Sequence, residues 1–335
     1  MKIAINGFGR IGRIFLRNIL LHPEIRVVAI NDLTDTQTLA HLFKYDSVHR
    51  GFKGTVSFDD NSLIINGNHI QVFAERDPLK LPWKTLDIDI VIESTGKFTS
   101  KTGAEAHLTA GARQVIISAP STDKNVPTVV LGVNDREVDL QSSVLSNASC
   151  TTNNVAAMVK ILDENWGIID GYITTVHSMT GDQSLHDAPH KDLRRARAAS
   201  ASIIPTTTGA AKAITAIFPH LDGRLGGAGI RVPVLNGSLT DFTCSLKKQP
   251  TIVQINEAFK QAANGPMKNV LEYTEDPVVS TDILDNPHSC IFDAQLTSIV
   301  GGLVKVVGWY DNEMGYSSRL ADLVVRIAEL KKQPA

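Results

Sequence analysis

The sequence predicts an α/β protein of two domains, the first with a mainly parallel sheet and the second an α+β domain with a mainly antiparallel or mixed sheet. Three observations carry this prediction. A buried-strand pattern at residues 1–6 runs into a glycine-rich turn and an amphipathic helix pattern that ends near Leu21. Short apolar runs then alternate with helices or connectors as far as residue 145. Beyond Cys150 the apolar runs are longer and alternate with polar residues, which is typical of half-buried strands.

The first half of the chain has the alternation that a parallel sheet requires. A helix is expected at residues 101–110, and strands are expected at residues 1–6, 26–31, 88–93, 114–118, 128–131 and 143–145. Parallel strands need long crossovers, which are usually helical, so this order favours a sheet covered on both faces. Such sheets bind ligands beyond the carboxyl ends of their strands, where residues 93–96 and 118–120 are expected.

The second half is expected to form its own sheet. A helix pattern covers residues 155–166, and strands are expected at residues 172–177, 229–233, 239–247 and 302–310. A final helix at residues 317–330 has apolar residues at helical spacing and can pack on the first domain. We therefore expect one domain at residues 1–149, completed by a C-terminal helix at 316–335, and a catalytic domain at residues 150–315.

Length and composition limit the class of protein. The chain has 335 residues, 43% of them apolar and 20% charged, with a formal net charge of −2. This size suits two domains, and the charge gives no drive toward nucleic acid or a membrane surface. No apolar run approaches the ~20 residues that span a bilayer, and the first residues enter a strand directly, which predicts a cytoplasmic protein without a signal peptide. The three cysteines lack CxxC spacing, so neither disulfides nor a metal site are expected.

The first turn has the spacing of a dinucleotide-binding fingerprint. Gly7 is expected to allow the tight turn, Gly9 to let the backbone approach a pyrophosphate, and Gly12 to permit close packing of helix on strand. A second strand ends at Asp32, twenty residues beyond Gly12. Its carboxylate can accept from ribose hydroxyls and would repel a 2′-phosphate, so a Rossmann-type domain that binds NAD, not NADP, is predicted. An ordinary turn residue is the alternative for Asp32.

One cysteine stands where a thiol becomes a nucleophile. Cys150 follows an expected strand and precedes a helix pattern, and the free amides at a helix start favour a thiolate. His177 ends the next expected strand, at residues 171–177, and can meet the sulfur there. Together the two residues predict a thiolate–imidazolium pair. A buried, space-filling cysteine and a structural histidine are the alternatives.

Groups suited to anions lie in the second half. The run at residues 206–212 includes Thr208 and Gly209 and opens a helix, so its hydroxyls and amides can bind phosphate or simply cap the helix. The cluster at residues 190–197 carries three arginines, for which a small phosphate, a neighbouring subunit's carboxylates and a solvated surface all remain open. Arg231 lies among apolar strand residues, where a charge needs a partner.

In combination, five motifs resemble the phosphorylating, glycolytic glyceraldehyde-3-phosphate dehydrogenase family over essentially the whole chain. These are INGFGRIGR at the start, SNASCTTN around Cys150, TTVHS around His177, TTTGAAKA from residue 206 and WYDNEMGYS from residue 309. The resemblance implies that Cys150 is the nucleophile and His177 its base. It implies that NAD is contacted by Arg10, Ile11, Asp32, Arg76, Ser118 and Asn312, in addition to the fingerprint glycines Gly7, Gly9 and Gly12. It places substrate and inorganic phosphate at Ser149, Thr151, Thr180, Arg195, Thr208, Gly209 and Arg231, with Arg194 and Arg197 remaining as candidates beside Arg195.

The activity that the resemblance implies is NAD-dependent oxidation of D-glyceraldehyde 3-phosphate with inorganic phosphate to 1,3-bisphosphoglycerate, in a cytoplasmic homotetramer. Two alternatives stay open. One is erythrose-4-phosphate dehydrogenase, which shares the cysteine and histidine but hydrolyses its thioester. The other is a nucleic-acid or partner-binding protein built on the same fold. The chain departs from the family in having Asn154 where a second cysteine is common, and Ala188-Pro189 in a segment that differs between NAD-specific and NADP-accepting members.

Overall fold

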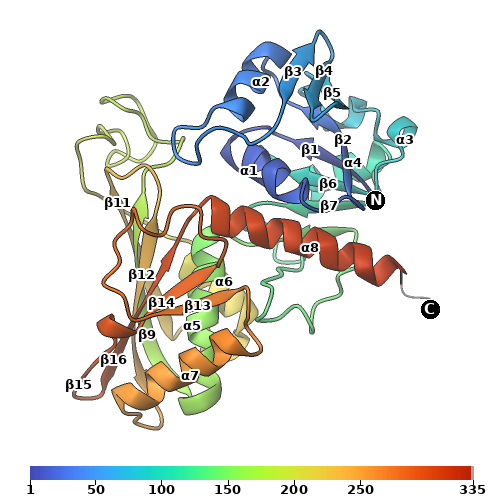
Figure 1. The fold of residues 1–335 in the computed structure, drawn as a ribbon. Coiled ribbons are helices and arrows are strands. Elements are labelled where there is room, and N and C mark those ends of the chain that lie inside the picture. The colour runs from blue at the N-terminus through green and yellow to red at the C-terminus, as the bar shows by residue number, and fades with distance from the viewer. Residues whose placement is uncertain (333–335) are drawn as a thin grey trace. The chain divides into compact units, whose positions relative to one another are not determined.

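A computed structural model describes residues 1–332 of the chain, which divide into two compact units (Figure 1). Unit 1 comprises Met1–Val129, Asp135–Ala148 and the chain from Ser317 onward, and unit 2 comprises Val130–Asn134 and Ser149–Tyr316. Each unit has its own eight-stranded sheet within the described residues. None of the described helices has the length and apolar character that crossing a membrane requires.

The sheet of unit 1 is parallel over most of its width. Its strand order is β3-β4-β5-β2-β1-β6-β7-β8. The strands are β1 (Lys2–Asn6), β2 (Arg26–Asn31), β3 (Val56–Asp59), β4 (Ser62–Ile65), β5 (Asn68–Phe73), β6 (Ile90–Glu93), β7 (Gln114–Ile117) and β8 (Val144–Ser146). Neighbouring strands are parallel throughout the stretch β5-β2-β1-β6-β7-β8. At the other edge β3 pairs with β4 and β4 with β5, both antiparallel. The chain runs to opposite sides of β1, so the carboxyl end of β1 is the switch point at which such sheets bind ligands.

Helices complete unit 1. They are α1 (Arg10–Ile19), α2 (Thr36–Lys44), the short α3 (Trp83–Leu86), α4 (Lys101–Thr109), the 3₁₀ turn η1 (Pro78–Lys80) and α8 (Met314–Lys332), which belongs to this unit from Ser317. Helix α1 buries Ile14, Phe15 and Leu16 completely. Helix α2 begins after Asp35, whose carboxylate accepts from the Thr38 amide at 2.8 Å and so satisfies a free donor of the first turn.

Unit 2 is built on a mixed sheet with the order β10-β11-β9-β12-β16-β14-β13, and β15 pairs with β16. Its strands are β9 (Ile168–Ser178), β10 (Ile204–Thr206), β11 (Leu225–Val232), β12 (Ser238–Leu246), β13 (Leu271–Thr274), β14 (Cys290–Asp293), β15 (Ser298–Val300) and β16 (Leu303–Tyr310). Only the β9–β11 and β13–β14 pairs are parallel. Its helices are α5 (Cys150–Trp166), α6 (Ala210–Ile217) and α7 (Ile252–Asn264), with 3₁₀ turns η2 (Pro219–Leu221) and η3 (Ala294–Leu296). Helix α5 packs against β9, β12, β14 and β16.

The predicted fold class is confirmed, and two expected elements need correction. The strand expected at residues 128–131 is wrong: only Thr128 forms an isolated bridge, to Ser146. The chain turns there because the Val130 amide donates to the Asn134 side chain at 2.8 Å and Gly132 adopts φ +78°. The helix expected from residue 155 begins at Cys150 instead, because Ser149 caps it.

Candidate active site

Three glycines shape the turn after β1, each for a different reason. Gly7 has φ +94°, and a Cβ there would lie 2.7 Å from the Thr95 amide nitrogen. A Cβ at Gly12 would lie 2.3 Å from the Gly7 carbonyl oxygen, whereas a Cβ at Gly9 would meet nothing within 4 Å. The first glycine thus makes the turn, the third lets α1 pack on β1, and the second leaves open space.

A cavity of about 330 Å³ opens beside this turn, within unit 1. Four of the predicted cofactor residues line it, namely Gly7, Gly9, Asp32 and Arg76. The remaining lining residues are Asn6, Asn31, Leu33, Glu75, Ser94, Thr95, Lys97 and Phe98. The cavity therefore lies at the carboxyl ends of β1, β2 and β6, where an open parallel sheet binds its ligand.

Asp32 is held rigidly at the cavity. Its carboxylate accepts from the Phe8 amide at 2.8 Å and from the Thr34 amide at 3.1 Å. Phe8 lies between the first two glycines, so these bonds fix a negative charge beside the turn. The arrangement suits hydrogen bonds from ribose hydroxyls and opposes a 2′-phosphate.

The side chain of Arg10 is committed to an internal ion pair. Its guanidinium donates to both oxygens of Asp46, at 2.6 and 3.1 Å. Burial opposes ionisation of Asp46, but hydrogen bonds from the His49 amide, the Arg10 guanidinium and the Val48 amide lower its pKa to about 2. Because the Arg10 side chain is paired with Asp46, the start of α1 offers an anion its free backbone amides. Ile11 lies in this first turn.

Five predicted cofactor residues lie outside the cavity lining: Arg10, Ile11 and Gly12 of α1, and also Ser118 and Asn312. Ser118 directly follows β7, and its amide donates to the Glu93 carbonyl oxygen at 2.9 Å. Asn312 belongs to unit 2, where its side-chain oxygen accepts from the hydroxyls of Ser178 and Ser238, each at 2.8 Å. Two donors on that oxygen fix the orientation of the Asn312 amide.

Cys150 is the first residue of α5, and the sequence around it explains the helix start. Ala148 adopts φ +56°, which turns the chain, and the Ser149 hydroxyl then accepts from the Thr152 amide at 3.1 Å. The Cys150 Sγ lies 3.5 Å from Nε2 of His177, the penultimate residue of β9. The helix start and the strand end therefore bring a thiol and an imidazole into contact, as expected for a nucleophile and its base.

The other ring nitrogen of His177 has two close neighbours. Nδ1 lies 2.8 Å from the Ser178 carbonyl oxygen and 2.8 Å from Nη1 of Arg231, which itself donates to that carbonyl at 3.0 Å. The carbonyl only accepts and the guanidinium only donates, so the two contacts favour opposite tautomers of His177. With the proton on Nδ1, bonded to the carbonyl, Nε2 is unprotonated toward Sγ. In that tautomer His177 can take the proton of the Cys150 thiol.

Burial works against the predicted thiolate–imidazolium pair. It raises the pKa of the Cys150 thiol, while the charge of Arg231 and hydrogen bonds with Thr151 act in the opposite direction. Burial and the Arg231 charge lower the pKa of His177 to about 4. The structure thus differs from the sequence prediction, because desolvation favours the neutral forms of both groups. Arg231 is the nearby charge that favours the thiolate.

Three of the predicted anion-binding residues surround one carboxylate, that of Asp182. The Thr180 hydroxyl donates to it, and Nη1 of Arg195 contacts it at 2.7 Å. Burial raises the pKa of Asp182, but the Thr180 hydroxyl and the charges of Arg231 and Arg195 together lower it by more. The net pKa of Asp182 lies below its ordinary value, so the carboxyl is ionised at neutral pH. An anion arriving here would compete with Asp182 for the same donors.

The arginines of the basic cluster differ in their partners. Arg195 also donates from Nε to the Thr206 hydroxyl at 3.0 Å, beside the run that opens α6. Arg197 pairs with Asp187 at 3.1 Å, and both side chains are largely exposed. Arg195 therefore contacts both Asp182 and the run that opens α6, whereas Arg197 pairs with an exposed carboxylate.

The remaining candidates lie at two helix starts of unit 2. Gly209 precedes α6 as its cap residue, and the Thr208 hydroxyl accepts from the Ala210 amide at 3.2 Å. At the start of α5 the Ser149 hydroxyl acts as the cap, whereas the Thr151 hydroxyl faces inward to Tyr310 at 2.9 Å. Helices α5 and α6 pack against each other.

Sequence reasoning missed Tyr310, which supports the Cys150–His177 pair. Its hydroxyl lies 2.9 Å from the Thr151 hydroxyl and 2.8 Å from that of Thr175, and its ring meets the His177 ring edge-on with centroids 6.0 Å apart. The signal available was its place in the WYDNEMGYS run, two residues before Asn312.

Comparison with known proteins agrees with this geometry. The family profile described as "Glyceraldehyde 3-phosphate dehydrogenase, NAD binding domain" matches residues 1–101, and the profile of the C-terminal domain of the same family matches residues 149–312. The NAD-binding profile confirms NAD as the cofactor.

Three relatives cover nearly the whole chain. A glyceraldehyde-3-phosphate dehydrogenase of Thermotoga maritima is 54% identical over 324 residues, which is 96% of this chain and 97% of the relative. One of Geobacillus stearothermophilus is 52% identical over 330 residues, or 98% of each chain. "Glyceraldehyde-3-phosphate dehydrogenase 2" of Streptomyces avermitilis is 52% identical over 328 residues, or 97% of this chain and 98% of the relative. With two matching profiles and relatives of this similarity, the chain belongs to the glyceraldehyde-3-phosphate dehydrogenase family.

Proposed function

We propose that this chain oxidises D-glyceraldehyde 3-phosphate with NAD and inorganic phosphate to give 1,3-bisphosphoglycerate. The observation that carries the proposal is the 3.5 Å contact between Sγ of Cys150 and Nε2 of His177 at the start of α5. Family membership supplies the reaction class, and the open space at Gly9 beside the cavity of unit 1 suits the pyrophosphate of NAD.

In the proposed mechanism Cys150 attacks the aldehyde carbon through Sγ while His177 accepts the thiol proton at Nε2. His177 returns that proton to the new oxyanion, which gives a neutral hemithioacetal on Cys150. NAD, when bound, supplies the hydride acceptor. As the hydride leaves, His177 takes the hydroxyl proton, and a thioester remains on Cys150. Phosphate then attacks the thioester carbon, and the departing sulfur recovers its proton from His177.

The two phosphates are proposed to bind to the donors gathered in unit 2. Thr180 and Arg231 are proposed to hold the phosphate of the substrate. Ser149, Thr151, Thr208, Gly209 and Arg195 are proposed to hold inorganic phosphate. The Thr151 hydroxyl points inward to Tyr310, so Thr151 is proposed to contact phosphate through its backbone amide at the start of α5. Because Arg231 also touches Nδ1 of His177, phosphate binding and the tautomer of the base are coupled through one guanidinium.

We also propose that residues 1–149, completed by the C-terminal helix, carry cofactor binding, and that residues 150–315 carry the chemistry. The division into units at Ser149 and Ser317 supports this assignment. The proposed NAD residues Gly7, Gly9, Asp32 and Arg76 all belong to unit 1, whereas Asn312 comes from unit 2.

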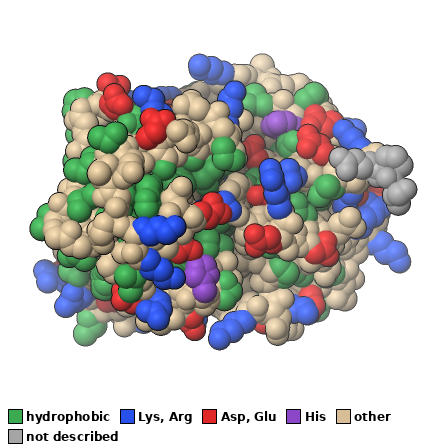
Figure 2. Space-filling model, turned by 90° about the horizontal axis from the view of Figure 1, so that it is seen from below, with side chains coloured by type: hydrophobic (Ala, Val, Ile, Leu, Met, Phe, Trp, Pro, Cys, Tyr) green, Lys and Arg blue, Asp and Glu red, His purple; other side chains and the backbone are tan. Residues whose placement is uncertain are grey.

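A cytoplasmic homotetramer without nucleic-acid or membrane partners is proposed as the working form. Exposed apolar side chains of unit 2 support self-association, among them Tyr172 at 52%, Leu303 at 53% and Leu193 at 82% exposure. Basic and acidic side chains are interspersed on the face that Figure 2 shows, which does not favour binding to a polyanion. Sedimentation velocity tests the oligomeric state, and a monomer at working concentration would contradict this part of the proposal.

The roles of the reacting pair are tested by two substitutions. Cys150→Ser should keep NAD binding and lose NADH formation, because an alcohol is hardly ionised at neutral pH. His177→Asn should keep NAD binding and slow the alkylation of Cys150 by iodoacetamide. Full turnover of Cys150→Ser, or an unchanged alkylation rate in His177→Asn, would contradict the assigned roles.

A further inference from the structure

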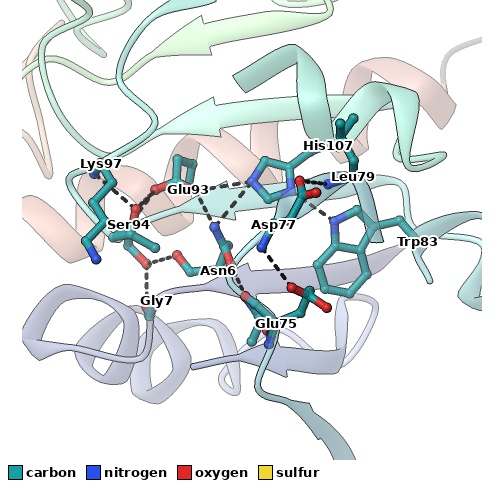
Figure 3. Close-up of polar contacts among 12 residues, drawn as sticks. Asn6, Gly7, Glu75, Asp77, Leu79, Trp83, Glu93, Ser94, Lys97 and His107 are labelled. Atoms are coloured by element: carbon teal, nitrogen blue, oxygen red, sulfur yellow. Dashed lines mark hydrogen bonds and ion pairs between the residues drawn. The ribbon is translucent and has the colours of Figure 1, made fainter. Parts of the chain in front are cut away.

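A polar network of unit 1 joins residues that line the cofactor cavity to buried residues that do not line it (Figure 3). Glu93, the last residue of β6, is 2% exposed, and His107 of α4 is 0% exposed. Neither residue lines the cavity, and the mechanism proposed above does not use them. Buried ionisable groups need strong partners, so their contacts show what holds them there.

Glu93 accepts hydrogen bonds from two residues that line the cavity. Its Oε2 accepts from the Asn6 side-chain amide at 2.6 Å. Its Oε1 accepts from the Thr95 amide at 2.9 Å and from the Thr95 hydroxyl. Both carboxylate oxygens therefore accept from residues of the cavity lining, which makes Glu93 the common acceptor of the network.

His107 supplies a further donor, and its tautomer is set by Trp83. The indole Nε1 of Trp83 donates to Nδ1 of His107 at 3.0 Å. An indole nitrogen never accepts, so Nδ1 carries no proton and the ring proton resides on Nε2. Nε2 lies 3.2 Å from Oε2 of Glu93 and donates to it. The Asn6 amide nitrogen lies 3.3 Å from Nε2, because both nitrogens donate to the same Glu93 oxygen. The His107 ring also meets the ring of Phe98, which lines the cavity, edge-on with centroids 6.3 Å apart.

The hydrogen bonds continue from Asn6 to Asn31 and Glu75, which also line the cavity. With its amide donating to Glu93, Asn6 turns its oxygen toward the Asn31 side-chain amide, at 2.7 Å. Asn31 in turn binds both the amide and the carbonyl of Glu75, each at 2.9 Å. One carboxylate thereby sets the orientation of amide side chains at the ends of β1 and β2 and of the loop before Arg76.

We propose that Glu93, oriented by the Nε2–H of His107, is a positioning residue for NAD binding. It holds Asn6 and Thr95 in one arrangement before the cofactor arrives, so that less ordering is needed on binding. The inference rests on the proposed function in one respect, because it takes this cavity to be the NAD site.

The test is Glu93→Gln in the full-length enzyme. The amide keeps the size of the side chain but turns an NH₂ group toward Asn6 or Thr95, so donors oppose each other in a buried site. We expect the Kd and KM for NAD to rise about five- to thirtyfold, on the scale of a buried unsatisfied donor. The kcat at saturating NAD and the alkylation rate of Cys150 should not change, because the hydrogen bonds of Glu93 all lie within unit 1, whereas the reacting pair belongs to unit 2.

Gln114→Met is the matched control. Gln114 lies on β7 of the same sheet, is 3% exposed, and donates to the carbonyls of Leu140 and Ser142 at 2.8 and 2.9 Å. Its loss should lower Tm without changing the Kd for NAD, since these bonds lie away from the cavity lining. A rise in Kd equal to that of Glu93→Gln at a similar loss of Tm would show a merely structural effect and overturn the proposal.

Two further measurements keep the proposal testable if Glu93→Gln does not fold. Trp83→Phe releases Nδ1 of His107 and lets the ring proton move there, so the Kd for NAD should rise about two- to fivefold, the scale of one neutral hydrogen bond. In the unmodified enzyme, nitrogen NMR of labelled histidine should show His107 protonated at Nε2. Protonation at Nδ1, or an unchanged Kd in the variants that fold, would overturn the proposal. Failure of the unmodified enzyme to bind NAD would instead contradict the proposed function.

Discussion

The three glycines after β1 allow one prediction to be worked out in detail. Gly9→Ala and Gly12→Ala add the same methyl group three residues apart, and the structure predicts different consequences. At Gly12 the new Cβ would lie 2.3 Å from the Gly7 carbonyl oxygen, a backbone atom that cannot move without opening the turn. At Gly9, which lines the cavity, it would meet no protein atom within 4 Å.

The expected magnitudes follow from these contacts. Alanine favours the interior of α1 over glycine by about 1 kcal/mol, but overpacking costs about 1–3 kcal/mol and more against rigid backbone. We therefore expect Gly12→Ala to destabilise unit 1 by about 1–3 kcal/mol, a fall in Tm of roughly 2–12 °C. In Gly9→Ala, alanine is a poorer helix cap, which destabilises the fold, but it also makes the unfolded chain less flexible, which stabilises the fold. We expect the two effects to cancel to within about 0.5 kcal/mol in the free energy of unfolding.

Cofactor binding separates the two variants further. In Gly9→Ala the methyl group stands where the backbone must approach the pyrophosphate, so the Kd for NAD should rise about 5- to 150-fold, or about 1–3 kcal/mol, at nearly constant Tm. Calorimetric titration with NAD and thermal unfolding followed by circular dichroism measure the two effects. A Gly9→Ala variant that binds NAD like the parent, or that unfolds at a lower temperature than Gly12→Ala, would refute this account of the turn.

Three other substitutions test the remaining electrostatics. Asp32→Asn removes the charge that faces a 2′-phosphate, so the preference in kcat/KM for NAD over NADP, which we expect to be about 10- to 150-fold in the parent, should narrow; an unchanged ratio would remove this role from Asp32. Asp46→Asn should cost about 1–2 kcal/mol at pH 7, because the folded pKa of Asp46, about 2, lies below its unfolded value of 3.8. That stabilisation is present above pH 3.8 and lost as pH falls toward 2, so the Tm difference from the parent should vanish over this range; a constant difference would contradict the assignment. Thr208→Ala should raise the KM for phosphate more than the KM for aldehyde, by roughly 1.5–3 kcal/mol, and equal increases would move Thr208 out of the phosphate site.

The parts of the fold and of the site that the sequence predicted correctly all depend on short-range patterns. The glycine spacing after β1 and the strand that ends before Asp32 are short-range signals, and the structure places Gly7, Gly9 and Asp32 around one cavity. Cys150 was expected at a helix start and His177 at a strand end, where the two side chains could meet. In the structure these side chains lie in contact. These predictions needed only the order of strands and helices.

The antiparallel edge of unit 1 was not predicted, although a signal was present. Asn66 and Gly67 both adopt positive φ, 51° and 79°, between β4 and β5. An Asn-Gly pair between apolar alternations is the strongest short hairpin signal. The strand expected at residues 128–131 failed for a related reason, because Gly132 and the side chain of Asn134 turn the chain locally.

Long-range contacts account for what the sequence did not predict. Arg10 pairs with Asp46, 36 positions away, and Tyr310 reaches Thr151 across 159 positions. The pKa of the Cys150 thiol depends on its burial, which is a property of the folded chain. No local pattern specifies such partners, so the roles of these side chains emerge only from the structure.

The central claim is that thioester chemistry on Cys150 ends with transfer to phosphate. Its most direct test is NADH formation from glyceraldehyde 3-phosphate and from erythrose 4-phosphate, each with and without inorganic phosphate. The account predicts rapid turnover of glyceraldehyde 3-phosphate that saturates with phosphate, and slow turnover without it. Phosphate-independent turnover with a preference for erythrose 4-phosphate would contradict it.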